Sequence, residues 1–222
     1  MIDRVTLYAL NVTPLQSEAL FGRYYESQPG WRKEKINALR RRADKLLSLG
    51  AGILLQAALP GAELSAMAFG ENGKPYLPGE TVHFNLSHAG EWVLCAVSNA
   101  PVGCDVELLR RWDMNVARRF FSAEETALLE AAQNDAARAD LFFRLWTLKE
   151  SYIKAVGEGL RLPLDSFTVR FVNNAPALAG LEDTWRLREY ALRPQYRCAV
   201  CAAAGAALPA TVEYLQLEKG AS

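Results

Sequence analysis

The sequence predicts an α+β fold arranged as two lobes. Helical patterns and short strand-like segments are mixed without the regular alternation that is typical of a doubly wound parallel sheet. Gly and Pro residues punctuate the strand-like segments in the middle of the chain. The stretch 99–103, which contains a Pro and a Gly, separates two halves of similar style. We therefore expect an N-terminal lobe over 1–101 and a C-terminal lobe over 102–222.

The first half is expected to begin with a strand and continue with helices. The predicted elements are a strand at 4–10, a helix at 15–28 ended by Pro29-Gly30, a long helix at 31–58 ended by Pro60-Gly61, short segments at 64–69, 82–88, 92–98 and 102–108, and a turn at 71–74. The long helical pattern is strongly basic in its first half. Its second half, 46–59, is nearly all apolar, so it must be buried.

The second half contains clear helix signals. Ser122 and Glu125 have the spacing of a capping box, which predicts that a helix begins there. A further helix is predicted from about Asp140 to Val156, ended by Gly157 or Gly159. The remaining strand-like segments are 166–172, 185–192, 196–203 and 211–218.

Composition excludes several classes of protein. A chain of 222 residues can bury a large core, and its 25 Lys+Arg balance its 25 Asp+Glu. The neutral net charge argues against nucleic acid as a partner. The N-terminus lacks the apolar stretch of a signal peptide, and no apolar run approaches the roughly 20 residues of a membrane span. We expect a cytoplasmic protein that binds neither membranes nor nucleic acid.

The four cysteines are expected to be buried, free thiols. Cys198 and Cys201 have CxxC spacing, but they lie in a strand-like run. No second CxxC and no neighbouring His complete a zinc site. A free Cys usually packs as a small hydrophobic residue, and this pattern suits a reducing compartment.

Two carboxylates stand two residues apart in one strand-like segment. Residues two apart point the same way in a strand, so Asp105 and Glu107 share one face and Val106 takes the other. Two carboxylates that close repel each other unless a cation or a proton lies between them. Mg²⁺ prefers oxygen ligands and combines few protein carboxylates with substrate phosphate. The pair is a candidate metal and phosphate site.

A third carboxylate and two lysines lie on the predicted helix 140–156. At about 100° per residue, Lys149 falls inside the apolar arc of the helix, while Glu150 falls at its edge, one turn before Lys154. A lysine in an apolar stripe is costly unless its ammonium finds a partner. Snorkelling or a plain Glu150–Lys154 ion pair would explain the pattern. The nearby Asp105 and Glu107 shift the interpretation toward a functional site.

His88 ends a strand-like segment, and two interpretations stay open. It alternates with Phe84 and Leu86, which suits a buried core histidine, but it also precedes the turn Ala89-Gly90, which could open onto a ligand. Ser87 and His88 do not form a nucleophile and its base, because adjacent strand residues point apart and no G-x-S-x-G motif is present. The basic run 32–45 is either a solvated helix face or a phosphate-binding helix start.

Several motifs together resemble one enzyme family. They occur in order with the spacing of the 4′-phosphopantetheinyl transferases of the larger, Sfp-type class, and they are Gly73-Lys-Pro-Tyr-Leu77, His83-Phe-Asn-Leu-Ser-His-Ala-Gly90, Val102-Gly-Cys-Asp-Val-Glu107, Arg119-Phe-Phe-Ser122 and Trp146-Thr-Leu-Lys-Glu-Ser-Tyr-Ile-Lys154. The resemblance is weakest before Lys45 and after Arg170. It implies two similar α+β lobes in one chain related by a pseudo-two-fold axis, with the active site in the cleft between them.

The resemblance also implies a reaction and its residues. Coenzyme A would donate its phosphopantetheine arm to a serine of an apo acyl or peptidyl carrier protein, releasing adenosine 3′,5′-bisphosphate. Mg²⁺, or Mn²⁺ in its place, would be held by Asp105, Glu107 and Glu150. Glu150 is also the expected base, and Lys154 and His88 would act on the phosphates. The expected coenzyme A contacts are Arg32, Lys35, Lys45, Lys74, Ser87, His88, Lys149 and Lys154, with Lys149 facing the cleft.

The carrier protein is the implied partner, and the protein is expected to be a monomer. The resemblance points to the segment 157–185 as the part that contacts the carrier, with apolar residues and Arg161 meeting an acidic carrier helix. Two alternatives remain open. A metal-dependent phosphoesterase would use the same acidic residues and consume coenzyme A without a carrier. A non-catalytic carrier-binding module would have a decayed site, which the intact motifs argue against.

Overall fold

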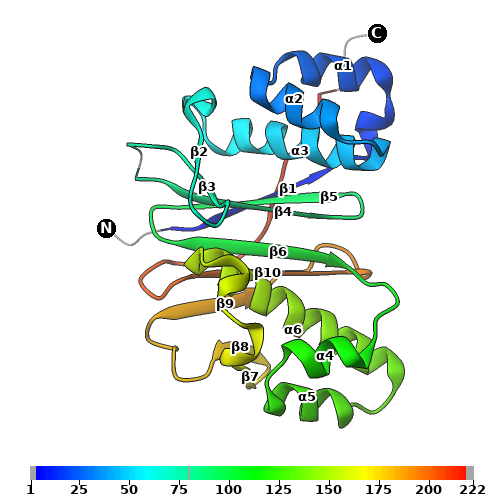
Figure 1. Ribbon diagram of the computed structural model, residues 1–222, viewed down its shortest axis with the longest axis vertical. Coiled ribbons are helices and arrows are strands. Elements are labelled where there is room, and N and C mark those ends of the chain that lie inside the picture. Colours follow the sequence, from blue (N-terminus) through cyan, green and yellow to red (C-terminus); the bar gives the residue numbers. More distant parts are fainter. Residues whose placement is uncertain (1–3, 80, 219–222) are drawn as a thin grey trace.

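The protein consists of two β-sheets that lie against each other, each covered on its outer side by helices. The computed structural model describes residues 4–79 and 81–218, apart from the side chain of Leu160. Helices α1–α3 cover one sheet and helices α4–α6 cover the other, so the layers run helix, sheet, sheet, helix (Figure 1). The mixed α+β class predicted from the sequence is confirmed.

Each half of the chain contributes helices and strands. The elements before residue 100 are β1 (Thr6–Asn11), α1 (Glu18–Glu26), α2 (Gly30–Ala38), α3 (Arg42–Ala58), β2 (Ala68–Phe69), β3 (Pro75–Tyr76), β4 (His83–Ala89) and β5 (Trp92–Ser98). Those after it are β6 (Val102–Leu108), α4 (Met114–Phe120), α5 (Ala123–Glu130), α6 (Asp135–Val156), β7 (Val169–Val172), β8 (Ala175–Leu178), β9 (Trp185–Glu189), β10 (Tyr196–Ala203) and β11 (Glu213–Tyr214). Short 3₁₀ helices lie at Thr13–Gln16, Leu64–Ala66, Gly159–Arg161 and Leu164–Ser166.

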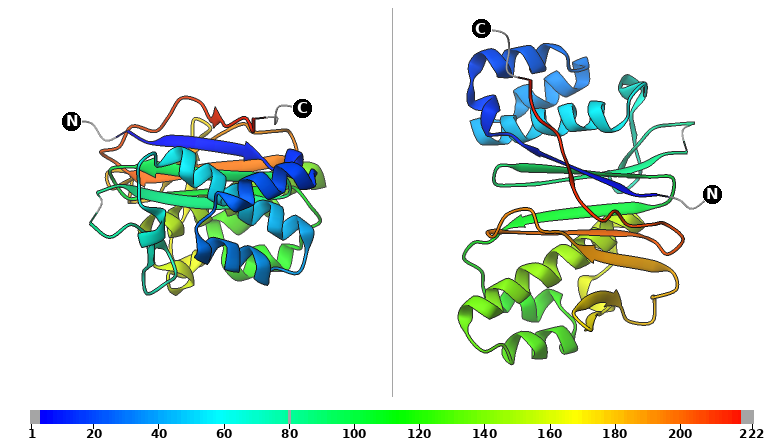
Figure 2. Two further views of the ribbon diagram at one scale, coloured as in Figure 1. Left: turned by 90° about the horizontal axis from the view of Figure 1, so that it is seen from above. Right: turned by 180° about the vertical axis from the view of Figure 1, so that it is seen from behind.

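The two larger sheets are mainly antiparallel. One has the order β11-β1-β5-β4, and the other has the order β6-β10-β9. Only the pairing of β1 with β11 is parallel within them. The chain after β10 returns to the first half, where it pairs with β1, and the right-hand view of Figure 2 shows this crossing.

Three apolar cores explain the layers. Alternate residues of β1, β5, β6 and β10 point into a core between the two sheets, for example Leu7, Leu94, Val106 and Val200. The opposite face of β5 packs against α3, and α6 packs against β10 in the third core. Because both faces of β5 and β10 are buried, these strands are nearly continuously apolar, as the sequence shows.

The predicted long helix at 31–58 is wrong at one point. The chain is extended at Leu39 and Arg41, with ψ of 137° and 135°, so α2 ends and α3 begins there. This break lets α2 fold back on α3 and bury Ile36 in the first core. The sequence pattern alone does not reveal the break, because no Gly or Pro marks it.

Other predicted boundaries need smaller corrections. The helix predicted at 15–28 begins after Ser17, whose hydroxyl caps it, and the helix predicted from Asp140 begins at Asp135, capped by Asn134. The strands predicted at 166–172, 185–192 and 211–218 are shorter, and the segment 64–69 is partly 3₁₀ helix. The sequence interpretation missed α4, β3 and β8.

Several local predictions are confirmed. The capping box of Ser122 and Glu125 is complete at the start of α5, and Gly157 ends α6 with a left-handed φ of 85°. The four cysteines are free and buried. Over residues 4–79 and 81–218, no helix is both long and apolar enough to cross a membrane.

Candidate active site

A seam of polar side chains joins strand β4 of one sheet to strand β6 of the other. The Asn85 side-chain oxygen accepts a hydrogen bond from the backbone N–H of Cys104 at 2.9 Å, and the Ser87 hydroxyl accepts one from the N–H of Val106 at 3.3 Å. Both side chains are buried. Side chains of β4 therefore satisfy backbone groups of β6 that would otherwise lack partners in the interior.

Asp105 lies at the centre of this seam. One of its carboxylate oxygens, Oδ1, accepts hydrogen bonds from the Ser87 hydroxyl at 2.8 Å and from the Lys154 ammonium at 2.6 Å. Lys154 also contacts the Ser87 oxygen at 3.2 Å. Three elements, β4, β6 and α6, thus meet at one buried, charged contact.

The close packing of α6 on β6 brings these groups together. A Cβ atom at Gly103 would lie 2.1 Å from the carbonyl oxygen of Ser151 and 2.4 Å from the N–H nitrogen of Ala155. Only glycine fits there, so the helix backbone lies directly on the strand. Asp105 and Glu107 follow on the same face as Gly103, as predicted, and face α6, which carries Glu150 and Lys154.

Glu107 and Glu150 complete an acidic group around Lys154. Burial, and after it the charge of Asp105, raise the pKa of Glu107 to about 7, although Arg110 opposes the shift. Burial is also the main cause that raises the pKa of Glu150; Lys154 opposes it and Asp105 adds to it. The three carboxylates are therefore close enough to repel one another.

Lys154 keeps its proton in this environment. Burial disfavours its ammonium, but the charge and hydrogen bond of Asp105 outweigh that penalty and raise the pKa of Lys154. Its side chain remains 27% exposed, whereas that of Asp105 is 6% exposed. The Lys154 side chain is therefore paired with a buried carboxylate and still partly exposed to solvent.

The carboxylates fit a hard cation in their chemistry. The second oxygen of Asp105, Oδ2, is buried and has no hydrogen-bond partner among the described residues. Within the same part of the chain, no three His, Cys, Asp or Glu side chains converge closely enough to hold a metal ion by themselves. A set of carboxylate oxygen ligands that leaves coordination positions open suits Mg²⁺, which keeps waters and substrate phosphate among its ligands.

His88 lies beside this group, exposed at the end of β4. Partial loss of contact with water, followed by the positive charge of Lys154, lowers the pKa of His88 and so favours the neutral imidazole. The charge of Lys35 on α2 also acts on His88. Lys154 therefore contacts Ser87, and its charge acts on the neighbouring His88.

Two of the expected coenzyme A contacts, Arg32 and Lys74, are engaged by backbone carbonyls of the protein. The guanidinium of Arg32 is buried and donates to the backbone carbonyl of Ser48 inside the first half of the molecule. The Lys74 ammonium is bound to three backbone carbonyl oxygens. Both cations are therefore engaged by backbone carbonyls, although Lys74 also lines the hollow beside Glu150 and Lys154. Lys45 is half-buried on α3.

The expectation that Lys149 faces the site is wrong. Its ammonium is fully buried and lies 2.6 and 2.7 Å from the two carboxylate oxygens of Glu125 on α5. It also donates to the carbonyl oxygen of Phe167 at 2.7 Å. The apolar arc of α6 faces the third core, so a lysine in that arc points into the core and meets a carboxylate there.

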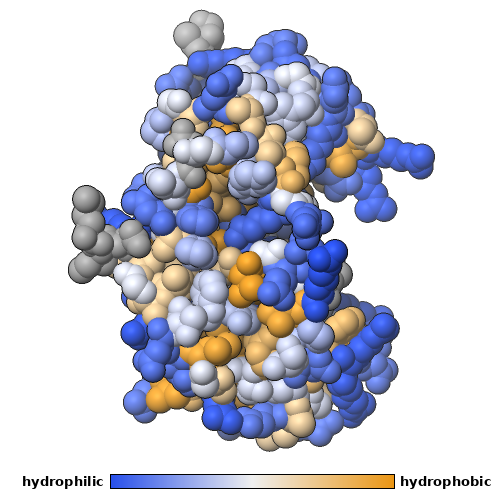
Figure 3. All heavy atoms as spheres, turned by 60° about the vertical axis from the view of Figure 1, so that its left-hand side comes forward, coloured by the Kyte–Doolittle hydropathy of each residue, from blue (hydrophilic) through white to orange (hydrophobic). Residues whose placement is uncertain are grey.

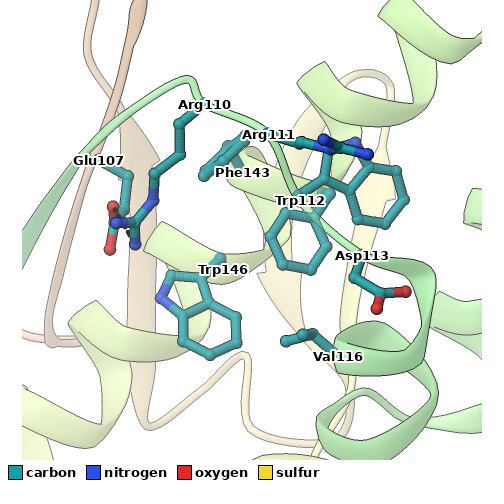
Figure 4. A pocket seen from close by; sticks show the side chains of 9 residues that line it. Glu107, Arg110, Arg111, Trp112, Asp113, Val116, Phe143 and Trp146 are labelled. Carbon is teal, nitrogen blue, oxygen red and sulfur yellow. Dashed lines mark ion pairs between the residues drawn. The ribbon is translucent and has the colours of Figure 1, made fainter.

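Two hollows flank the acidic group. One, of about 270 Å³, is lined by Glu150, Lys154 and Asn85 together with residues of the β2–β3 turn and of the end of α6. The other, of about 480 Å³, lies beyond Glu107 and is lined by Arg110, Trp146 and neighbouring side chains of α4 and α6 (Figure 4). The surface is also indented between the two halves, with hydrophilic residues around the indentation (Figure 3).

Sequence reasoning missed Asn85 and the aromatic hollow. Asn85 and Ser87 are polar residues two apart in an apolar strand, which is the signal that could have identified the seam. The hollow beyond Glu107 depends on Trp112 of the loop after β6 and on Trp146 of α6, which are far apart in the sequence. No local pattern brings those two together.

Comparisons with known proteins identify the family of this chain. The 4′-phosphopantetheinyl transferase superfamily model matches residues 101–201. A 4′-phosphopantetheinyl transferase of Bacillus subtilis is 38% identical over 181 residues, which cover 78% of this chain and 80% of that protein. The transferase Sfp of Bacillus subtilis strain 168 is 42% identical over 60% of this chain and 61% of its own length. The transferase gsp of Aneurinibacillus migulanus is 36% identical over 67% of this chain and 63% of its own.

One solved structure is similar over part of the chain. The holo-[acyl-carrier-protein] synthase of Thermotoga maritima aligns with a TM-score of 0.40 and 21% identity, covering 47% of this chain and 62% of that one. The sequence relatives are closer than this structure. The sequence relatives and the family model show that the chain belongs to the 4′-phosphopantetheinyl transferase superfamily. They confirm the resemblance to Sfp-type transferases that was inferred from its motifs.

Proposed function

We propose that this protein transfers the 4′-phosphopantetheine arm of coenzyme A to a serine of an apo acyl or peptidyl carrier protein, releasing adenosine 3′,5′-bisphosphate. The carrier would belong to a peptide, polyketide or fatty-acid synthase. The observation that carries the proposal is the contact of Asp105, Ser87 and Lys154 beside Glu107 and Glu150. Family membership supports the same reaction.

The proposed arrangement is two similar α+β lobes related by a pseudo-two-fold axis. The boundary lies between residues 101 and 102, just before β6 begins, and the protein is proposed to act as a monomer. In each lobe a long helix, α3 or α6, packs its apolar face on the outer side of one of the two sheets. The site would then lie where β4 of one lobe meets β6 of the other.

Mg²⁺ would be held by Asp105, Glu107 and Glu150, with the free Oδ2 of Asp105 as its first protein ligand. When bound, it would neutralise charge on the transferring phosphoryl group and on the leaving phosphate. Mn²⁺, with the same preference for oxygen ligands, is the proposed substitute. Burial is the main cause of the raised pKa values of Glu107 and Glu150, and a bound cation would lower both by favouring the charged carboxylates.

The residues around the carboxylates supply the rest of the chemistry. The carrier serine oxygen forms a bond to the phosphorus of the pantetheine phosphate while the bond from that phosphorus to the bridging oxygen breaks. Glu150 takes the serine proton, directly or through water, because its raised pKa makes it a stronger base than an ordinary carboxylate. Lys154 donates to the departing bridging oxygen.

Substrate contacts are proposed on both sides of this centre. His88 and Ser87 would hydrogen-bond the pyrophosphate, and Lys35 and Lys45 would meet the adenosine 3′-phosphate. The segment 157–185, which follows α6 directly, is the proposed carrier contact. Asp105, Glu107, Glu150, Lys154 and His88 thus form the proposed catalytic centre.

Intact-protein mass spectrometry of an apo carrier protein tests the function. The carrier would be incubated with this protein, coenzyme A and Mg²⁺, with a chelator control. We expect a mass gain of one phosphopantetheine group that the chelator abolishes. If coenzyme A is consumed when the carrier is omitted, the protein is a phosphoesterase. If peptidyl and acyl carriers all stay unmodified by well-folded protein, the proposal is wrong.

A further inference from the structure

The Lys74 ammonium connects the β2–β3 hairpin to the last turn of α6, which belongs to the other half of the chain. It donates to the carbonyl oxygens of Lys154 at 2.6 Å, Ala155 at 3.1 Å and Val102 at 3.2 Å. The first two carbonyls belong to α6, and the third belongs to β6. A single side chain thus binds the hairpin, the helix end and the strand at once.

These carbonyls need a partner that the helix does not supply. The last four carbonyl groups of an α-helix have no N–H donor within the helix. Gly157 satisfies only the carbonyl of Ile153, to which its own N–H donates at 2.8 Å. A cation at the C-terminal end of a helix is also favoured by the helix dipole. The Lys74 ammonium meets both requirements for the carbonyls of Lys154 and Ala155.

The position of Lys74 bears directly on Lys154. The backbone carbonyl of Lys154 accepts from Lys74, while its side-chain ammonium donates to Asp105 and Ser87. A shift of the last turn of α6 would therefore move the Lys154 ammonium relative to Asp105. The hairpin adds a second contact at the same place, from the Asn72 side-chain amide to the carbonyl oxygen of Gly157 at 3.1 Å.

The ammonium of Lys74 remains charged in this position. Burial lowers the pKa of Lys74 to about 8, which still leaves most molecules protonated at pH 7. With its three donors directed at three carbonyl oxygens, it has no N–H left for a phosphate. These contacts argue against the phosphate-binding role that its motif implies.

We propose that Lys74 is a positioning residue, which holds the last turn of α6 against β6 so that the Lys154 ammonium stays at Asp105. This inference rests on the proposed transferase reaction for its kinetic consequence. Its structural consequence, an ordered end of α6, does not depend on any activity. Misplacing a catalytic group by about 1 Å can lower a rate by about 100-fold.

The test compares Lys74→Met and Lys74→Arg with a matched control, Glu71→Gln. Glu71 lies in the same hairpin and forms an exposed ion pair with Arg161 at 3.8 Å, so its loss should have little effect. Hydrogen–deuterium exchange of peptides covering 150–158 is measured first. We expect faster exchange there in Lys74→Met, partial recovery in Lys74→Arg and no change in Glu71→Gln, with exchange in α3 unaffected.

Kinetics with coenzyme A and with 3′-dephospho-coenzyme A then separate positioning from substrate binding. For Lys74→Met we expect kcat to fall by about 10- to 100-fold. The KM for coenzyme A should change less than about 3-fold, and the preference for coenzyme A over the dephospho form should persist, because positioning acts on the transition state rather than on substrate binding. Loss of that preference would show that Lys74 contacts the phosphate and would overturn the proposal.

Two further outcomes are decisive. Unchanged exchange at 150–158 in folded Lys74→Met would overturn the proposal even if the wild-type protein proved inactive as a transferase. Faster exchange at 150–158 with an inactive wild type would instead contradict the transferase proposal alone. If Lys74→Met does not fold, Asn72→Ala replaces it, with the same expected pattern and a smaller fall in kcat; unchanged exchange in that variant would also overturn the proposal.

Discussion

Two lysines on helix α6 each form an ion pair with a carboxylate, but the two pairs differ in their surroundings. Lys149 and Lys154 each place an ammonium 2.6 Å from a carboxylate oxygen, of Glu125 and Asp105 respectively. The pair of Lys149 is completely enclosed, and both oxygens of Glu125 have donors. The pair of Lys154 is partly open, and one oxygen of Asp105 has no partner among the described residues.

The difference distinguishes an ion pair that only stabilises the fold from an ion pair that is proposed to act in the active site. A buried pair whose hydrogen bonds are all made can only stabilise one conformation, because it offers nothing to a ligand. The pair of Lys154 leaves one carboxylate oxygen without a partner among the described residues and the lysine side chain partly exposed, as the proposed binding of a cation and a phosphate requires. Two lysines five positions apart on one helix thus lie in different settings, one in the core of the second half and one at the proposed active site.

Asp105→Ala should have the largest effect on activity, and an active variant would contradict the proposed role of the Asp105–Lys154 pair. We expect this variant to lose transfer by at least about 1000-fold, which corresponds to about 4 kcal/mol of transition-state stabilisation. Both the cation and the Lys154 ammonium lose their partner in it. Transfer to an apo carrier, measured by mass spectrometry beside a circular dichroism spectrum, would check the result.

Lys149→Met should lower the stability of the protein rather than its transfer activity per folded molecule. It leaves the Glu125 carboxylate charged and enclosed, so we expect the free energy of unfolding to fall by about 3–5 kcal/mol. The double variant Lys149→Met/Glu125→Gln removes both charges and should recover part of that loss, although one backbone N–H, of Ser122 or Val169, then loses its acceptor. Denaturant unfolding at pH 7 measures both. A double variant no more stable than the single one would contradict the assignment of a closed pair.

The pH dependence of Mg²⁺ binding tests whether Glu107 is a ligand of the cation. The pKa of Glu107 is raised to about 7 in the folded protein, so the native state holds this proton more tightly than the unfolded chain does. Stability from this group is therefore lost as pH rises through about 7, and a bound cation would restore it. We expect the Mg²⁺-induced rise in Tm to be small at about pH 5.5 and larger at about pH 8. A Mg²⁺-induced rise in Tm that is larger at about pH 5.5 than at about pH 8 would contradict the role of Glu107 as a ligand.

Arg110→Gln should have the smallest effect. Arg110 lies 3.8 Å from Glu107 and is 72% exposed, so the pair contributes at most about 0.5 kcal/mol to stability. Glu107 should bind Mg²⁺ equally well or slightly better in this variant, because a competing cation is gone. Thermal unfolding with and without Mg²⁺ checks this; a large loss of stability would mean that Arg110 supports the site.

Local patterns in the sequence predicted much of this structure. The bounds of β6 and β10 and the cap of α5 follow from signals within a few residues. The grouping of Asp105, Glu107 and Glu150 near Lys154 follows from strand and helix periodicity combined with family motifs. The orientation of Lys149 could not be obtained in this way, because a lysine in an apolar arc has no distinguishing mark until its partner on another helix is known.

Long-range contacts account for the remaining errors. The break at Leu39 exists because α2 gains burial against α3, and the three acceptors of Lys74 come from segments distant in the sequence. Arg32 was expected at a phosphate because it begins a basic run, yet its guanidinium donates to the carbonyl of Ser48. Charge pattern alone does not distinguish a surface arginine from one that satisfies a buried carbonyl.

The most direct test measures carrier modification by two folded variants side by side. Apo carrier protein, coenzyme A and Mg²⁺ are incubated with Asp105→Ala or with Lys149→Met/Glu125→Gln, and the intact carrier mass is recorded. We predict that the Asp105 variant leaves the carrier unmodified and that the double variant modifies it at close to the wild-type rate per folded molecule. Modification by Asp105→Ala, or none by the folded double variant, would contradict the assignment of the open pair to chemistry and the closed pair to structure.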